Sequence, residues 1–109
     1  MRIWDLPPRV LCRQHLLGEH RELHAIWVVI TEKKRGYANH PETIRWRGKL
    51  RALYQRHDAL VAEMAKRGFQ HHSELNARLA RGAAKQTDFV NPIREQRQIL
   101  RAKKCKCQV

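Results

Sequence analysis

The stretch QHLLGEHRELHAIW, residues 14–27, decides the fold predicted for this chain. Its apolar residues Leu16, Leu23 and Trp27, continued by Ile30, recur at intervals of seven, four and three residues. This spacing places them on one face of an α-helix, because the helix has a period of 3.6 residues. We therefore predict that the stretch is the middle of a long helix that packs one face against a core.

The other side of this predicted helix carries small and polar residues. Gly18 lies one turn before Glu22, and Ala25 lies one turn after it, with Gln14 on the same side. Small residues allow another molecule to approach the backbone closely, and a carboxylate placed there can act on what arrives. Two interpretations stay open: an ordinary exposed glutamate on an amphipathic helix, or a glutamate in a functional site.

The charge of the chain predicts a polyanionic partner. Lys and Arg number 23 against 10 for Asp and Glu, giving a formal net charge of +13 and a pI near 10.7. Nucleic acid is the first candidate and a membrane surface the second. No run approaches the roughly 18 apolar residues of a membrane-spanning helix. No helix pairs a clean apolar face with a basic one, so we expect no membrane attachment.

Length and cysteine content favour one small domain in a reducing compartment. The 109 residues, 42% of them hydrophobic, suit a single domain over residues 1–109, which we expect to be a monomer. No export signal is visible before Pro7 and Pro8. Three cysteines, Cys12, Cys105 and Cys107, are an odd number and do not form a disulfide framework. We expect a cytoplasmic, nucleoid-associated protein.

The apolar periodicity predicts an all-α fold, a compact single-domain bundle of three main helices with the N-terminal segment packed near the first. The first helix should begin at Pro7-Pro8, run to about residue 34 and stop before Gly36. The second should begin at Pro41 and end at Gly68, a left-handed cap. The third should run from Asn91-Pro92 to about residue 104.

The remaining segments receive simpler predictions. Apolar residues at positions 3, 4 and 6 should pin the N-terminus against the body. A short helix over residues 73–81, opened by Ser73 and Glu74, should precede a loop over residues 82–88. The tail over residues 103–109 is basic, and we expect it to fray.

The second predicted helix has an apolar stripe and an excess of cations at its exposed positions. His57 lies on the apolar stripe and is interpreted as a hydrogen-bonded core residue. The apolar residues of this stripe are Trp46, Leu50, Leu53, Leu60, Val61 and Met64. Cations occupy the predicted exposed positions, and they are Arg45, Arg47, Lys49, Arg51 and Arg56. An excess of one sign predicts a surface that faces phosphates, although a solvated face is the simpler alternative.

The cysteines and histidines give only weak metal signals. Cys105 and Cys107 could bind a metal together with His71 or His72, but a C-x-C pair falls well short of a four-ligand pattern. We interpret His71-His72 as a polar turn and Cys12 as a small hydrophobe in the core. The sequence analysis therefore predicts no metal and no cofactor.

Five groups near the start of the chain can carry chemistry. They are Gln14, His15, Arg21, Glu22 and the α-amino group of Met1. An α-amine is partly neutral near cellular pH and can attack an electrophilic sugar carbon.

Residues 13–23, RQHLLGEHREL, resemble the catalytic helix of the pyrimidine-dimer DNA glycosylase family, also called the endonuclease V family. The similarity includes Arg2-Ile3 near the start and covers about the first 70 residues, apart from the loop near residues 35–45. The matching helix positions are Gln14, His15, Leu16, Glu19, Arg21, Glu22 and Leu23. A second segment in register contains Lys49-Leu50, Leu53, Arg56, Leu60, Ala62-Glu63 and Lys66-Arg67-Gly68-Phe69.

The resemblance implies a DNA repair glycosylase with abasic-site lyase activity on double-stranded DNA. In that family the N-terminal amine attacks C1′ of the damaged nucleotide, the base departs, a Schiff base forms and β-elimination cuts the strand. Glu22 matches the carboxylate that moves protons, and the family turns a nucleotide out of the stack. Gln14, His15 and Arg21 match residues that contact DNA around the lesion, and Arg2 is expected to do so too.

The register of the resemblance predicts that Met1 supplies the amine. The family's phage enzyme exposes a threonine at this point by removal of methionine, whereas the bulky Arg2 here should keep a deformylated Met1 in place. Ala25 replaces a third arginine, and the tail replaces an aromatic segment, so catalysis transfers better than lesion choice. Cyclobutane pyrimidine dimers are the expected substrate. The alternatives are another bulky or modified base, or a non-catalytic basic DNA-binding protein in which Glu22 is structural.

Overall fold

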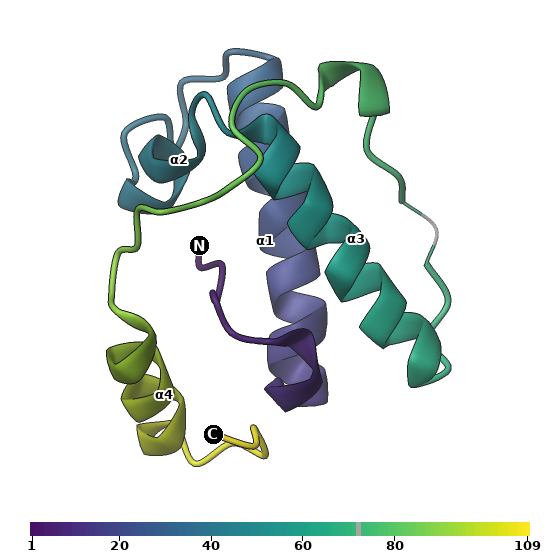
Figure 1. The fold of residues 1–109 in the computed structure, drawn as a ribbon, viewed down its shortest axis with the longest axis vertical. Helices are drawn as coiled ribbons and strands as arrows, with labels where there is room; N and C mark the ends of the chain where they lie inside the picture. Colours follow the sequence, from purple (N-terminus) through teal and green to yellow (C-terminus); the bar gives the residue numbers. More distant parts are fainter. Residues whose placement is uncertain (72) are drawn as a thin grey trace.

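The computed structural model describes residues 1–71 and 73–109 and is helical, which confirms the predicted all-α fold with three main helices (Figure 1). The described residues contain no strand, only an isolated bridge between Lys49 and Gly82. The elements in chain order are η1 Pro8–Val10, α1 Arg13–Thr31, α2 Pro41–Trp46, α3 Leu50–Lys66, η2 Ala77–Leu79 and α4 Ile93–Ala102.

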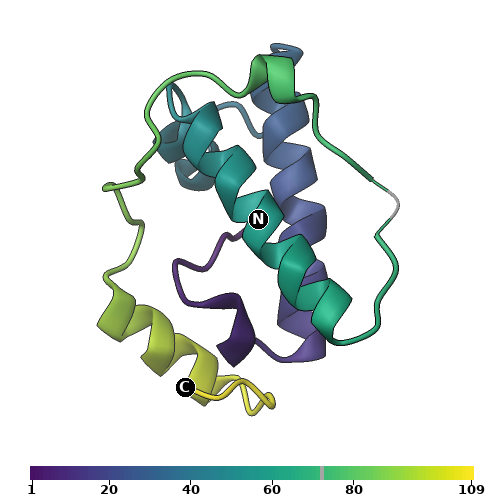
Figure 2. The same cartoon turned by 45° about the vertical axis from the view of Figure 1, so that its right-hand side comes forward.

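The core lies between α1 and α3, which cross in both views (Figures 1 and 2). Leu16 and Leu23 of α1 are fully buried, as are Leu53 and Leu60 of α3, so the predicted apolar stripes face each other. Truncating such a residue to alanine typically costs about 2–5 kcal/mol. These two helices therefore form the rigid frame to which the rest of the chain is attached.

The first helix is shorter than predicted at both ends. The prolines form the separate turn η1, and α1 begins only at Arg13, with Cys12 as its extended N-cap. At the other end Lys33 adopts a left-handed conformation (φ 53°), and the N–H of Lys34 donates to the carbonyl of Val29 at 3.1 Å. This contact closes the helix before Gly36, the predicted stop.

The second predicted helix is interrupted, which the sequence analysis missed. Gly48, at φ 74°, separates α2 from α3. Gly82, at φ 89°, packs so closely against the Gly48 carbonyl that a Cβ there would collide with it. The N–H of Ala83 donates to that same carbonyl at 2.9 Å. The segment after α3 therefore packs against the chain at the break between α2 and α3.

The end of α3 agrees with the prediction, but the next segment does not. Gly68 is left-handed (φ 82°), and the N–H of Phe69 donates to the carbonyl of Met64 at 2.9 Å, a standard helix stop. The helix predicted over residues 73–81 is wrong. Only the short turn η2 forms, and Asn76 caps it by accepting from the N–H of Arg78 at 3.0 Å.

The C-terminal segment is folded onto the molecule, so the prediction that it frays is wrong. The N–H of Gln108 donates to the carbonyl of Val10 at 2.7 Å, and Cys105, Cys107 and Val109 pack against the core. Helix α4 lies beside the N-terminal segment, and the tail returns to the start of α1 (Figures 1 and 2). The tail therefore lies near the first turn of α1, while the N-terminus lies apart from it, nearer the middle of the molecule (Figure 1). Within the described residues no helix is long and apolar enough to cross a membrane.

Candidate functional site

The N-terminal segment, residues 1–6, is held in the body of the protein. Ile3, Trp4 and Leu6 are buried, as predicted from their apolar character. Two arginines bond to its carbonyls: Arg45 Nη2 donates to Ile3 at 3.0 Å and Arg56 Nη1 donates to Leu6 at 2.7 Å. A chain end usually frays, but these bonds hold residues 3–6 against the body of the protein.

A buried carboxylate on α1 fixes the middle of the segment. Glu19 is fully buried and accepts the N–H of Trp4 at 3.0 Å. Arg56 of α3 donates to both of its oxygens, at 2.6 Å and 3.0 Å. Burial raises the pKa of the Glu19 carboxyl, while the Arg56 guanidinium and the Trp4 N–H oppose this shift. Glu19 therefore holds the N-terminal segment against α1, a role that was not predicted from the sequence.

A second ionic group fixes the same segment from α2 and α4. Arg45 Nε donates to Glu42 at 2.7 Å, and its Nη1 donates to Asp5 at 3.1 Å. Gln96 of α4 accepts the N–H of Asp5 at 2.8 Å and donates to its carboxylate at 3.0 Å. Four helices thus contribute to holding six residues. Removing one partner of such a buried pair typically costs about 3–5 kcal/mol.

Met1 and Glu22, the two residues proposed from the sequence as catalytic, line one pocket. The pocket has a volume of about 220 Å³, and Glu22 reaches it from α1 as a partly exposed side chain. Gly18, one turn earlier, contributes no side chain and leaves open space above its Cα. The lining residues are Met1, Arg2, Trp4, Gln14, His15, Gly18, Glu19, Glu22 and Lys103.

Cationic and aromatic side chains surround Met1 and Glu22. The Arg2 guanidinium lies 4.5 Å from the centre of the Trp4 ring and donates to Asn91 at 2.7 Å. The His15 ring meets Trp4 edge-on at 5.9 Å. Burial, and then the nearby Lys103 charge, lower the pKa of His15. The site thus holds a primary amine and a carboxylate among positive groups, which suits a negatively charged substrate.

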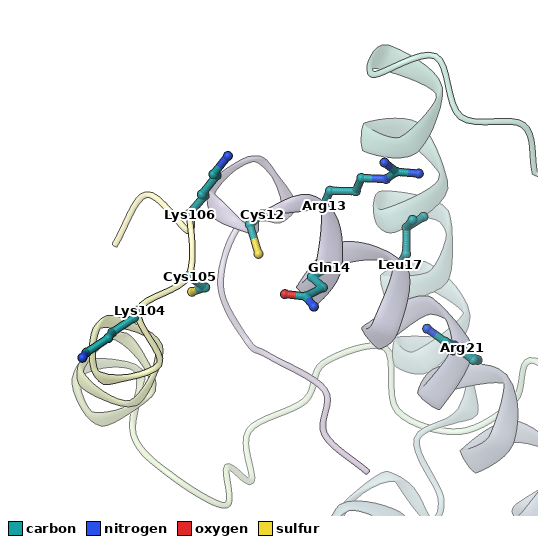
Figure 3. Close-up of a pocket in the computed structure, with 8 residues that line it drawn as sticks. All are labelled: Cys12, Arg13, Gln14, Leu17, Arg21, Lys104, Cys105 and Lys106. Carbon is teal, nitrogen blue, oxygen red and sulfur yellow. The ribbon is translucent and has the colours of Figure 1, made fainter.

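A larger basic pocket of about 630 Å³ shares Gln14 with the smaller one (Figure 3). Arg13 and Arg21 line it on α1, while Lys104 and Lys106 line it on the C-terminal segment. All four cations are exposed. The sequence analysis named Arg21 and a basic tail but not Arg13, and the run of lysines over residues 103–106 was the signal that pointed here.

The predicted DNA-binding residues divide into two groups. Arg2, Gln14 and His15 lie at the pocket with Met1 and Glu22, and Arg21 lines the larger pocket. Arg47 is exposed on α2's C-terminal side and donates to the Ala38 carbonyl at 3.1 Å.

The expectation that Arg45, Lys49 and Arg56 are exposed is wrong. Arg45 is 7% exposed, and all three side chains form ion pairs within the protein. Lys49 pairs with Asp88 and donates to Gln86 at 2.7 Å. A surface pattern cannot distinguish a cation that faces solvent from one that meets a partner distant in sequence.

Cysteines and histidines gather at two places in the part of the chain that the structure describes. Cys105 and Cys107 lie beside Cys12 and His15, not beside His71 as the sequence analysis considered. His72 lies outside the described residues. Cys12 is partly exposed with its sulfur against His15, so the expected role as a core hydrophobe is wrong.

A scan against protein families matched residues 1–77 with the model described as pyrimidine dimer DNA glycosylase. No curated protein and no solved structure matched the chain. The matched residues include α1, both arginines that hold the N-terminal segment, and every lining residue of the smaller pocket except Lys103. The chain belongs to the pyrimidine dimer DNA glycosylase family.

Proposed function

We propose that this protein is a DNA repair glycosylase with abasic-site lyase activity, in which the α-amine of Met1 is the nucleophile and Glu22 the acid–base group. The observation that carries the proposal is that Met1 and Glu22 line one small pocket in a chain of this family. An amine and a carboxylate side by side are the two groups that Schiff-base chemistry on a sugar requires.

The packing of residues 1–6 supports the role of the amine. The bonds that Arg45, Arg56, Glu19 and Gln96 make to this segment hold the backbone that ends at Met1. A nucleophile fixed in place reacts faster than a mobile one, because the entropy of orientation is already lost on folding.

In the proposed reaction the neutral Met1 amine forms a bond to C1′ of the nucleotide as the bond from C1′ to the base breaks, and the base takes up the proton that the amine loses. The sugar ring opens, with Glu22 supplying a proton to the ring oxygen, and an imine joins C1′ to the enzyme. Glu22 then removes a proton from C2′, and the bond from C3′ to the phosphate oxygen breaks. Water releases the cut strand from the amine.

The distribution of cations supports a DNA substrate. The pocket carries Arg2 and Lys103, and the adjoining larger pocket carries Arg13, Arg21 and two more lysines. A duplex presents phosphates on both sides of a damaged nucleotide, and base-acting enzymes turn that nucleotide out of the stack to reach it. We propose that Gln14 and His15 contact DNA beside the turned-out nucleotide and that pyrimidine dimers are the substrate.

Trapping of the covalent intermediate tests this function. Purified protein is incubated with duplexes that carry one abasic site, one cyclobutane pyrimidine dimer or no lesion, with borohydride present. We expect a reduced protein–DNA adduct with the abasic and the dimer duplex and none with the undamaged one. Binding of all three duplexes without any adduct or strand cleavage would instead support a non-catalytic DNA-binding protein. An adduct with the abasic duplex alone would point to a different damaged base.

A further inference from the structure

Three sulfur atoms and one imidazole meet where the C-terminal segment returns to the start of α1. Cys12 is the N-cap of α1, and His15 lies one turn into the helix. Cys105 and Cys107 approach from the other end of the chain, and the four ligand atoms all lie within 4.8 Å of one another. The His15 Nδ1 atom is 3.1 Å from the Cys12 sulfur and 3.3 Å from the Cys107 sulfur.

The geometry points to one bound ion. Zn–S bonds of about 2.3 Å and Zn–N bonds of about 2.0–2.1 Å place tetrahedral ligands roughly 3.3–3.8 Å apart, close to the separations found here. A disulfide would use only two of the sulfurs, and all three cysteines are free. The Cys12 N–H also donates to the Cys107 sulfur at 3.1 Å, a bond that would stabilise a thiolate ligand.

We propose that Cys12, His15, Cys105 and Cys107 bind a structural zinc ion. Three thiolates with one imidazole are a set that zinc takes in closed tetrahedral sites. Each thiol releases its proton as its bond to zinc forms. The sequence analysis expected no metal, because only the short C-x-C pair was visible and its partners lie about ninety residues earlier.

This ion fastens the C-terminal segment to the catalytic helix. On this segment Lys103 lines the smaller pocket, and Lys104 and Lys106 line the larger one. Figure 3 shows Cys12 and Cys105 on opposite sides of the gap between α1 and this segment. The zinc site itself is independent of the proposed function, whereas its contribution to DNA binding rests on that function.

Cobalt substitution tests the sulfur site without DNA. The full-length protein is purified, its metal content is measured, and the metal is exchanged for cobalt. We expect zinc as isolated, and a near-ultraviolet sulfur-to-cobalt charge-transfer band of the intensity given by three thiolates. Cys107→Ser should weaken the band and lower zinc affinity, while Lys106→Ser, a matched change between the two cysteines, should leave both unchanged.

Several outcomes would overturn this assignment. They are a wild-type protein without the charge-transfer band, a Cys107→Ser variant with the full band, or iron as the isolated metal. If Cys107→Ser does not fold, Cys105→His provides the test instead, because a histidine can still bind zinc. This variant should keep the ion and lose one third of the charge-transfer intensity. Unchanged intensity in that variant would refute the site. The trapping reaction on abasic DNA is scored separately, so either proposal can fail alone.

A second group, made only of histidines, carries its own inference. His20 and His24 project from α1, His57 projects from α3, and His71 follows that helix, with one ring nitrogen of each within 4.8 Å of the others. The His24 Nε2 atom is 3.2 Å from the Nε2 atoms of both His20 and His57. One nitrogen holds either one proton or one lone pair, so only one of these contacts can be a linear hydrogen bond.

Unpaired atoms in the same group strengthen the case. Among the described residues, His57 Nδ1 and His71 Nε2 are buried without a hydrogen-bond partner. The His57 Nε2 atom faces His24, while its Nδ1 atom lies 3.7 Å from the Asp58 carboxylate, beyond hydrogen-bond distance.

We infer that these four histidines bind a divalent transition-metal ion, with zinc as the test ion, and so join α1, α3 and the segment that follows. Imidazole is a ligand that zinc, copper and nickel share. In metal-free protein reloaded with zinc, we expect two ions per chain in the wild type and one in His57→Gln. His57→Gln should keep the full cobalt–sulfur band of the first site.

The matched control is His40→Gln, because His40 caps α2 and lies outside both groups. It should retain two zinc ions. Equal zinc content in His57→Gln and the wild type would refute the histidine site. His20→Gln provides the same comparison if the buried His57 cannot be changed without unfolding, since His20 is partly exposed.

Discussion

Glu22→Gln is expected to slow strand cleavage at an abasic site by about 10²–10⁴-fold, the usual contribution of a general acid–base group. Glutamine has nearly the same volume as glutamate, but it cannot take up or release a proton. The pocket would lose a negative charge beside Arg2 and Lys103, so affinity for duplex DNA should not fall. Single-turnover cleavage of an abasic duplex, together with a binding titration, measures both effects.

Glu32→Gln is the matched control for this change. Glu32 follows the last residue of α1, is exposed and pairs with Lys34 at 3.9 Å, far along the helix from the pocket. The Glu32→Gln substitution removes the same charge, and the variant should cleave abasic DNA at the wild-type rate. A wild-type rate for Glu22→Gln would show that Glu22 is not the acid–base group of the proposed mechanism.

Extending the chain before Met1 by a few residues is expected to reduce borohydride trapping to background. The α-amine would become an amide nitrogen, which is not nucleophilic, and the new residues would have to leave through a pocket of about 220 Å³. DNA binding should persist, because Arg13, Arg21 and the lysines of the C-terminal segment are not affected. A gel for the reduced adduct and a binding assay give the two readouts.

The control for the extension is its own removal. A protease site placed directly before Met1 allows the same preparation to be tested before and after cleavage, and cleavage should restore the adduct. An extended protein that forms the adduct as efficiently as the cleaved one would show that a lysine, or another amine, is the nucleophile.

The frame of the fold could be predicted because its signals are local. The buried faces of α1 and α3 follow from apolar residues three, four and seven positions apart, and Gly68 marks the end of α3 through its left-handed conformation. The break at Gly48 was missed because one glycine inside a helical pattern is usually tolerated. The stop at Lys33 was missed because lysine seldom adopts that conformation.

The site was predictable only in part. The pairing of Met1 with Glu22 came from the family resemblance, since no periodicity joins residues 1 and 22. Arg45 and Arg56 looked like exposed cations, because their partners Asp5 and Glu19 lie 40 and 37 positions away. The cluster of three cysteines and His15 could not be predicted for the same reason, because Cys12 and Cys107 are 95 positions apart.

The bond between Asp5 and Gln96 joins residues that are 91 positions apart. A ribosome releases the beginning of a chain first, so Asp5 emerges long before its amide partner has been made. A nascent chain therefore carries the amine that we propose as the nucleophile before the anchor for Asp5 exists. Under the proposed function, the order of translation delays the chemistry until the chain is nearly finished, and contacts over such long loops also make that last folding step slow.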